Sequence, residues 1–212
     1  MDIILKQATQ DNLKSIAKCY MNSFPNSVST KLGLNYITHN LGWFLNDEKK
    51  ILFFIEIENI CVGFCGGYIW EKSGDGSTSS MLKYSKSIRN AILIKKPWLL
   101  FNYEIIKKIF TFIIIKSSII IKNKYNKIDP NARTMPSLGL VVIGVHSNYK
   151  GNNISSKLME EFIRKGKEIE ISNFHLSVRK NNLRAYHFYL KHGWKVDELT
   201  NKGKNTFSMK IY

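Results

Sequence analysis

Hydrophobic positions along the chain alternate between the two-residue period of strands and the helical period of three to four residues. Strand patterns occupy six segments: 3–7, 51–57, 60–70, 138–145, 174–178 and 206–211. Helical spacing occupies four segments: 9–20, 29–46, 154–166 and 182–192. Because the two kinds of element alternate, the sequence predicts an α/β (α+β) fold with a mixed sheet, formed by one domain over residues 1–212.

A β-hairpin is predicted in the first half of the chain. Glu58 and Asn59 separate the segments 51–57 and 60–70, and this pattern is typical of two strands joined by a tight turn. Three glycines in the second of these strands predict a bulge or a close approach of another backbone: Gly63, Gly66 and Gly67.

The second half contains a strand, loop and helix that could bind an anion. The continuous apolar segment 138–145 is typical of a central strand, and a Gly/Asn-rich loop then opens a helix at about Ile154. Unpaired amides at a helix N-terminus attract phosphate. Gly151 permits close backbone approach, and Asn153 tolerates a positive φ. The alternative is an ordinary turn between a strand and a helix.

Composition is ordinary except for its charge. The 212 residues are 44% hydrophobic and 23% charged, which excludes wholesale disorder. The net charge is +16, which indicates an anionic partner: phosphate, nucleic acid or a membrane face. Residues 82–128 contain eleven Lys or Arg and one acid, Glu104, and so supply +10 of that charge. We expect a mostly helical insertion over residues 72–136, between the third and fourth strands.

Cysteine usage and hydropathy restrict the location of the protein. Cys19, Cys61 and Cys65 form no paired spacing, so we expect neither a disulfide framework nor a metal site, and a reducing compartment fits best.

The most apolar window, 98–121, is interrupted by one Glu and three Lys, which disfavours a membrane span. The N-terminus has no basic segment of a secretory signal. We expect a cytoplasmic protein, with membrane association through residues 82–128 as an alternative.

Two motifs resemble those of the GNAT superfamily of N-acetyltransferases. The closing motif of that family has a strand, an Asn, an Ala, an aromatic-Tyr pair and a Gly-aromatic pair; here these are Leu176-Ser177-Val178, Asn182, Ala185, Phe188-Tyr189 and Gly193-Trp194. The family's central motif, V-x-P-x-Y-R-G-x-G-x-G/A, is similar to the segment from Val145 to Ser155. This chain departs from it at three positions: Lys150 for Arg or Gln, Asn153 for Gly, and Ser155 for Gly or Ala.

The resemblance implies a GNAT fold and transfer of acetyl from acetyl-CoA to an amine. It implies that the backbone of Ile143, Gly144 and Val145 pairs with the pantetheine arm. The pyrophosphate would be held by six consecutive residues: Lys150, Gly151, Asn152, Asn153, Ile154 and Ser155. Asn182 would bind the pantetheine or cap its helix, and Tyr189 would be the general acid for the departing thiolate.

The general base and the acceptor remain open at the level of sequence. Four residues are weak candidates for the base: Glu56, Glu58, His146 and His175. The long basic insertion is similar to that of acetyltransferases acting on nucleotide-linked amino sugars, which predicts a small, anionic amine acceptor and no nucleic-acid partner. The alternatives are a protein N-acetyltransferase and a catalytically weak membrane-surface module. An apolar helical face at 105–110 further suggests a homodimer as one way to bury it.

Overall fold

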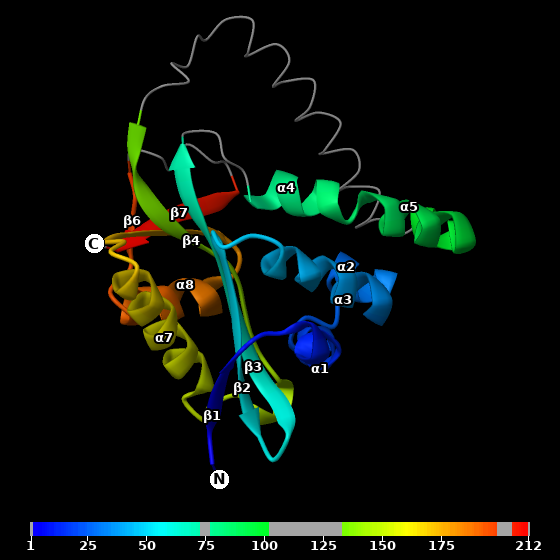
Figure 1. The fold of residues 1–212 in the computed structure, drawn as a ribbon, viewed down its shortest axis with the longest axis horizontal. Coiled ribbons are helices and arrows are strands. Elements are labelled where there is room, and N and C mark those ends of the chain that lie inside the picture. Colours follow the sequence, from blue (N-terminus) through cyan, green and yellow to red (C-terminus); the bar gives the residue numbers. More distant parts are fainter. Residues whose placement is uncertain (1, 73–76, 102–132, 199–204, 212) are drawn as a thin grey trace, which may run out of the picture.

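The fold is built on one seven-stranded sheet with helices on both faces (Figure 1). The computed structural model describes residues 2–72, 77–101, 133–198 and 205–211. The strand order is β1-β2-β3-β4-β5-β7-β6. All neighbouring strands are antiparallel except β4 and β5, which run parallel. The predicted mixed α/β fold is therefore confirmed.

The strands follow the predicted hydrophobic segments closely. Their bounds are β1 Ile4–Gln7, β2 Lys50–Ile57, β3 Ile60–Lys72, β4 Arg133–Val145, β5 Asn173–Arg179, β6 Lys195–Val196 and β7 Thr206–Ile211. β4 begins at Arg133, upstream of the apolar segment that predicted it, because its first residues pair with the extended end of β3. The short β6 had no hydrophobic pattern of its own and was not predicted.

Two hydrophobic clusters hold the helices on opposite faces of the sheet. The helices of the first half are α1 Leu13–Ser23, α2 Val28–Leu32 and α3 Leu34–Gly42, with short 3₁₀ turns η1 Gln10–Asn12 and η2 Trp43–Leu45. They share one buried cluster with one face of the sheet. Helices α7 Ile154–Glu168 and α8 Leu183–Lys191 bury their apolar side chains in the other cluster, and Figure 1 shows them on the opposite side of the sheet.

The helix predicted within residues 29–46 is present as α3, but it is shorter than that range, and a separate helix, α2, precedes it. Gly33 separates α2 from α3 and has φ +99°, a conformation that glycine adopts without steric cost. The last residues of the predicted helix, Trp43–Leu45, form a 3₁₀ turn instead. Periodicity alone did not reveal the break, because the apolar side chains on both sides of Gly33 enter the same buried cluster.

The predicted hairpin is confirmed, and its glycines lie where neighbours approach closely. Glu58 has φ 51° and Asn59 has φ 61°, as in the primed turns that suit the twist of a hairpin. The β3–β4 register shifts between Gly66 and Gly67, so a bulge lies there. A Cβ at Gly67 would lie 2.6 Å from Cε2 of Phe162 on α7. The expected bulge is therefore present in this strand pair, with its extra residue, Val141, on β4. The closest approach at Gly67 is made by a side chain and not by another backbone.

The described part of the segment between β3 and β4 is helical. It forms α4 Ser77–Tyr84, α5 Lys86–Lys95 and the 3₁₀ turn η3 Pro97–Phe101. Ser85, between the two helices, is fully buried and donates a hydrogen bond of 2.6 Å to Oδ1 of Asn40 on α3. The apolar face predicted at 105–110, and with it the rest of residues 102–132, lies outside the described residues. In the described ranges, no helix is long and apolar enough to cross a bilayer.

Candidate active site

The central strands β4 and β5 pair only at their first residues and then separate. The parallel pairing comprises Ser137↔Asn173, Leu138↔Phe174 and Gly139↔His175. Just beyond it, the register of β4 against β3 skips Val141, so β4 carries a bulge there. A bulge bends and twists its strand, which explains why β4 leaves β5 at this point. In the described residues, Ile143–Val145 pair with β3 on one side and have no strand partner on the other.

Gly144 is required by packing inside this separated strand. A Cβ at this position would lie 2.7 Å from the ring of Phe64 on β3 and 3.0 Å from Phe24 beyond α1. The neighbours Ile143 and Val145 are only partly buried. The polar groups that this stretch could offer to a ligand therefore belong to its backbone.

The loop after β4 leaves the N-terminus of α7 without a side-chain cap. Gly151 has φ +92° and Asn153 has φ 60°, so both adopt the left-handed conformations expected from their residue types. Asn153 is the N-cap residue of α7 but makes no side-chain capping bond. The first amides of a helix have no acceptor within the helix. Together with the helix dipole, they create a site that favours an anion.

The loop is held in place from α1 and from the hairpin. The Ser147 amide donates to Oδ1 of Asn22 at 2.8 Å, and the His146 amide donates to the Val62 carbonyl at 2.9 Å. Nδ1 of His146 accepts from the Asn148 amide at 3.3 Å. His146 is thus engaged in loop structure. No local pattern pointed to Asn22, because its role depends on a contact across 125 residues.

Helix α8 contacts β5 and carries Asn182 at its N-cap and Tyr189 in its last turn. Oδ1 of Asn182 accepts from the Ala185 amide at 3.2 Å, which is the capping role predicted for it. Gly193, at φ +80°, ends the helix as expected. Tyr189 is buried and meets the ring of Trp194 edge-on at 6.2 Å. Burial raises the pKa of the Tyr189 hydroxyl above its usual value, so it is protonated at neutral pH.

A hydrogen bond between side chains joins the two helices of the site. Oγ of Ser156, in the first turn of α7, lies 3.1 Å from Nε2 of His192 at the end of α8. Burial lowers the pKa of His192, which favours the neutral ring. This contact fixes the position of the α7 N-terminus relative to the helix that carries Tyr189. It was not predicted from the sequence.

The remaining candidates for a general base are accounted for by structural contacts or by their position in a turn. His175 lies against Gly139 and packs at a tilt on Trp70, with ring centroids 4.1 Å apart. Its buried Nε2 has no hydrogen-bond partner in the described residues. Burial lowers its pKa to about 4. Glu56 is ion-paired with Lys6 on the neighbouring strand β1. Glu58 occupies the exposed hairpin turn.

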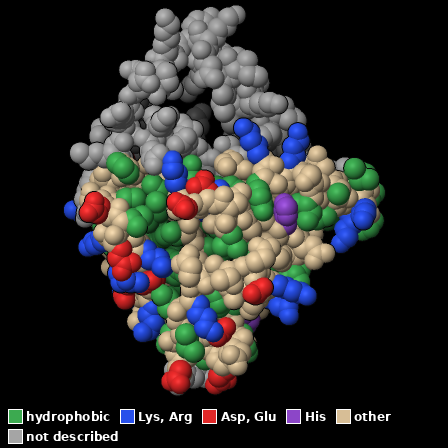
Figure 2. All heavy atoms as spheres, in the orientation of Figure 1, with side chains coloured by type: hydrophobic (Ala, Val, Ile, Leu, Met, Phe, Trp, Pro, Cys, Tyr) green, Lys and Arg blue, Asp and Glu red, His purple; other side chains and the backbone are tan. Residues whose placement is uncertain are grey.

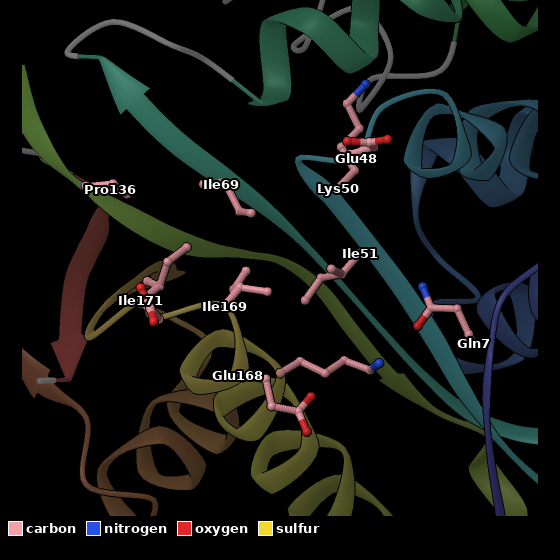
Figure 3. Close-up of a pocket in the computed structure, with 11 residues that line it drawn as sticks. Gln7, Glu48, Lys50, Ile51, Ile69, Pro136, Glu168, Ile169 and Ile171 are labelled. Atoms are coloured by element: carbon pink, nitrogen blue, oxygen red, sulfur yellow. The ribbon is translucent and has the colours of Figure 1, made fainter.

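A cavity in the described structure lies away from these residues. It has a volume of about 740 Å³ and is lined from the C-terminal end of α7 and from the start of β2 by side chains that include Lys50, Glu168 and Ile169 (Figure 3). The candidate loop lies at the other end of α7. Because α7 has 15 residues, at ~1.5 Å each its two ends are about 22 Å apart. The cavity is therefore separate from the candidate active site.

Comparison with known proteins shows what the region that contains this candidate site is similar to. Residues 125–194 match the model of the acetyltransferase (GNAT) family, and this range includes β4, the loop, α7, β5 and α8. No curated protein sequence matches the chain.

Several solved structures share the fold at low sequence identity. The PaiA N-acetyltransferase of Thermoplasma acidophilum, solved with coenzyme A, superposes with a TM-score of 0.58 at 12% identity, with 100% of both chains covered. The ribosomal-protein-S18-alanine N-acetyltransferase of Escherichia coli gives 0.55 at 10% identity, with 99% of this chain and 93% of that chain covered. An aminoglycoside 6'-N-acetyltransferase of Acinetobacter baumannii gives 0.54 at 8%, with 92% and 91% covered. These superpositions show that the chain has the GNAT fold, and the family match shows that its residues 125–194 are similar to the acetyltransferase (GNAT) family.

Proposed function

We propose that the protein transfers the acetyl group of acetyl-CoA to the primary amine of a small, anionic molecule. The observation that carries the proposal is the uncapped N-terminus of α7, which follows directly on a strand whose edge is free toward β5. Acetyl-CoA needs both features side by side: the helix N-terminus for its pyrophosphate, and the free strand edge for its extended arm with two amide groups. The neighbour from Thermoplasma acidophilum was solved with coenzyme A, which supports the same donor.

The cofactor residues expected from the sequence fit this donor. Amides from Gly151 to Ser155 would receive the pyrophosphate, and the charge of the exposed Lys150 would add to the attraction. Lys keeps the positive charge of the usual Arg but presents no planar fork, so it binds phosphate as a point charge. The backbone of Ile143–Val145 would pair with the pantetheine arm as an added strand. Asn182 is already used as a helix cap, which leaves its amide nitrogen free to donate to the arm.

Tyr189 is proposed as the hydrogen-bond donor to the departing thiolate. Its burial keeps the phenol protonated, and a thiol needs little assistance because its pKa is about 8.5. A phenol with a raised pKa donates a hydrogen bond more readily than it surrenders its proton. We therefore propose that Tyr189 stabilises the thiolate by donating a hydrogen bond. The proton that finally neutralises the thiolate is the one released by the attacking amine.

The acceptor class is inferred from charge. A chain with a net charge of +16 attracts anions and repels polyamines and other cationic amines. A nucleotide-linked amino sugar combines a primary amine with a diphosphate and fits this requirement. If it is the acceptor, its Michaelis constant rises with ionic strength, because salt screens the attraction. An uncharged amino sugar serves as the control and shows no such dependence.

The first test replaces Gly151 with Val. A β-branched residue is strained at φ +92° and crowds the approach to the loop amides. We expect acetyl-CoA affinity, measured by titration calorimetry, to fall at least tenfold, or ~1.4 kcal/mol. Gly33→Val is the matched control, because Gly33 has a similar φ of +99° with no atom within 4 Å of its Cβ position, on a helix junction remote from the loop. Equal affinity in both variants contradicts the assignment of the loop.

The second test replaces Tyr189 with Phe. The ring and its packing against Trp194 are kept, and only the hydroxyl is lost. We expect kcat to fall by ~10²–10⁴-fold, the usual contribution of such a donor, with acetyl-CoA affinity unchanged. Tyr186→Phe, on the same helix, is the control and is expected to retain activity. Full turnover of the Tyr189 variant with chemistry rate-limiting assigns the donor role to another group.

A further inference from the structure

The surface formed by α5 and η3 differs from the rest of the exterior. Three large apolar side chains stand in solvent there: Ile94 is 80% exposed, Trp98 62% and Phe101 84%. They are the most exposed of the large hydrophobic residues in the described structure. Exposed apolar groups are common singly, but a cluster of this kind marks a contact surface. We refer to these three residues with Lys95 and Lys96 as the α5–η3 patch.

The orientation of the patch is fixed by the packing of its own helix. Ile88, Ile92 and Leu93 of α5 and Leu99 of η3 pack against the cluster around α3. Ile94 lies about 200° around the helix from Ile92, at ~100° per residue, so it points away from that cluster. Trp98 and Phe101 are three residues apart in a 3₁₀ turn and therefore project from the same side.

The patch is basic as well as apolar. Lys95 and Lys96 are exposed and lie between Ile94 and Trp98 in the sequence, and Lys86, the first residue of α5, is exposed as well. The chain has no acidic residue between Asp75 and Glu104. At the edge of the molecule that corresponds to α5 in Figure 1, Figure 2 shows hydrophobic and basic side chains side by side. A partner of this surface therefore has negative charge and an apolar interior that can receive Trp and Phe.

The patch is remote from the candidate active site. Helix α5 contacts α3 and α4, and in Figure 1 it projects away from the end of the sheet that carries β5 and α8. Its basic residues are therefore separate from the gap between β4 and β5. A role in binding the acetyl donor does not account for them.

We propose that the α5–η3 patch binds the surface of an anionic lipid bilayer. Lysines attract acidic headgroups, and a Trp with neighbouring Phe and Ile suits the boundary between headgroups and acyl chains. A nucleic acid would use the lysines but would leave Ile94 and Phe101 in water. The proposed association is peripheral, because it uses side chains exposed on the surface of α5 and η3.

The test uses the full chain and vesicles of two compositions. Vesicles of phosphatidylcholine with 30% phosphatidylglycerol are compared with pure phosphatidylcholine by sedimentation at low and physiological salt. We expect binding to the anionic vesicles only, weakened by salt. Insertion is followed through Trp98, whose iodide quenching disappears on binding. The contribution of Trp98 is isolated by subtracting a Trp98→Phe variant, because the chain has three other tryptophans: Trp43, Trp70 and Trp194.

Matched variants separate the two parts of the patch. Lys95→Gln with Lys96→Gln is expected to weaken vesicle binding about 25-fold, at about fivefold for each lysine near an anionic surface. Trp98→Ala with Phe101→Ala is expected to weaken it at least ~10-fold through lost apolar burial. Lys191→Gln with Lys195→Gln removes the same charge from exposed positions at α8 and β6 and is expected to bind like the wild type.

Several results overturn the proposal. They are absence of binding to anionic vesicles, equal binding to neutral vesicles, and equal loss in the control and patch variants. A solution mass of twice 24.6 kDa that returns to the monomer in the Trp98/Phe101 variant assigns the patch to a second copy of the chain. Binding to duplex DNA that depends on the lysines but not on the aromatic residues assigns it to nucleic acid. Circular dichroism of each variant confirms the fold, which exposed substitutions are expected to preserve.

Discussion

His175 couples the protonation of a single side chain to the stability of the fold. Its ring fills the space above Gly139, where a Cβ would lie 2.4 Å from Nε2. Burial lowers its pKa from 6.5 to about 4 in the folded protein. The unfolded chain therefore binds a proton more readily than the folded chain between these two values. The stabilisation is complete above pH 6.5 and is lost as the pH falls toward 4.

A pH series on a His175→Gln variant tests this coupling. Between pH 7.5 and pH 5, we expect the free energy of unfolding of the wild type to fall by about 2 kcal/mol more than that of the variant, as an upper limit. Urea unfolding at both pH values provides the measurement. Other titrating groups affect both proteins equally and cancel in the comparison. Parallel pH profiles for the two proteins would show that the ring is accessible to protons in the folded state.

Residue type predicted the backbone of the active-site loop but not its supports. Gly151 and Asn153 were expected to tolerate positive φ, and both adopt it. Asn182 was expected to cap α8, and it does. These are local properties, because a turn or a cap involves residues a few positions apart. Asn22 and His192 contact the site from distant segments, so no local pattern could identify them.

Among the elements, the β2–β3 hairpin has one residue unsuited to its turn. Glu58 has φ 51°, and left-handed backbone costs most residues about 1–2 kcal/mol, whereas Asn tolerates it. We expect Glu58→Asn to raise the free energy of unfolding by about 0.5–1 kcal/mol in urea titrations. Glu198→Asn removes the same charge from another exposed position and is expected to change it little. If the two variants are stabilised equally, turn geometry does not account for the gain.

Element boundaries were predicted less well than element types. The apolar segments correctly gave six of the seven strands, because burial on a sheet imposes a hydrophobic pattern. The break at Gly33 and the upstream extension of β4 were missed. Both features depend on contacts with other segments. Side chains from both sides of Gly33 enter the same buried cluster, and the first residues of β4 pair with the end of β3.

For the whole molecule, the charge of +16 acts against compactness. Like charges repel one another more strongly in the folded state than in the expanded chain. Raising the ionic strength shortens the screening length from about 30 Å at 0.01 M to about 8 Å at 0.15 M. We expect the melting temperature to rise by about 2–4 °C, equivalent to ~1 kcal/mol for a chain of this size. NaCl and KCl are expected to act alike, and a flat or falling melting temperature would contradict the electrostatic origin.

The sequence by itself determined the fold class and the turn chemistry, because these depend on periodicity and on neighbouring residues. The candidate cofactor loop was singled out by the resemblance of its motif to that of the GNAT superfamily. Only the tertiary structure decided where β4 leaves β5. That separation depends on a bulge at Val141 between two partner strands and on the space that Gly144 leaves for Phe64. It also decided that the basic helix α5 packs on α3 and directs Ile94, Trp98 and Phe101 into solvent. The charged and apolar residues can be read from a sequence, but the direction in which their side chains point depends on contacts between distant segments.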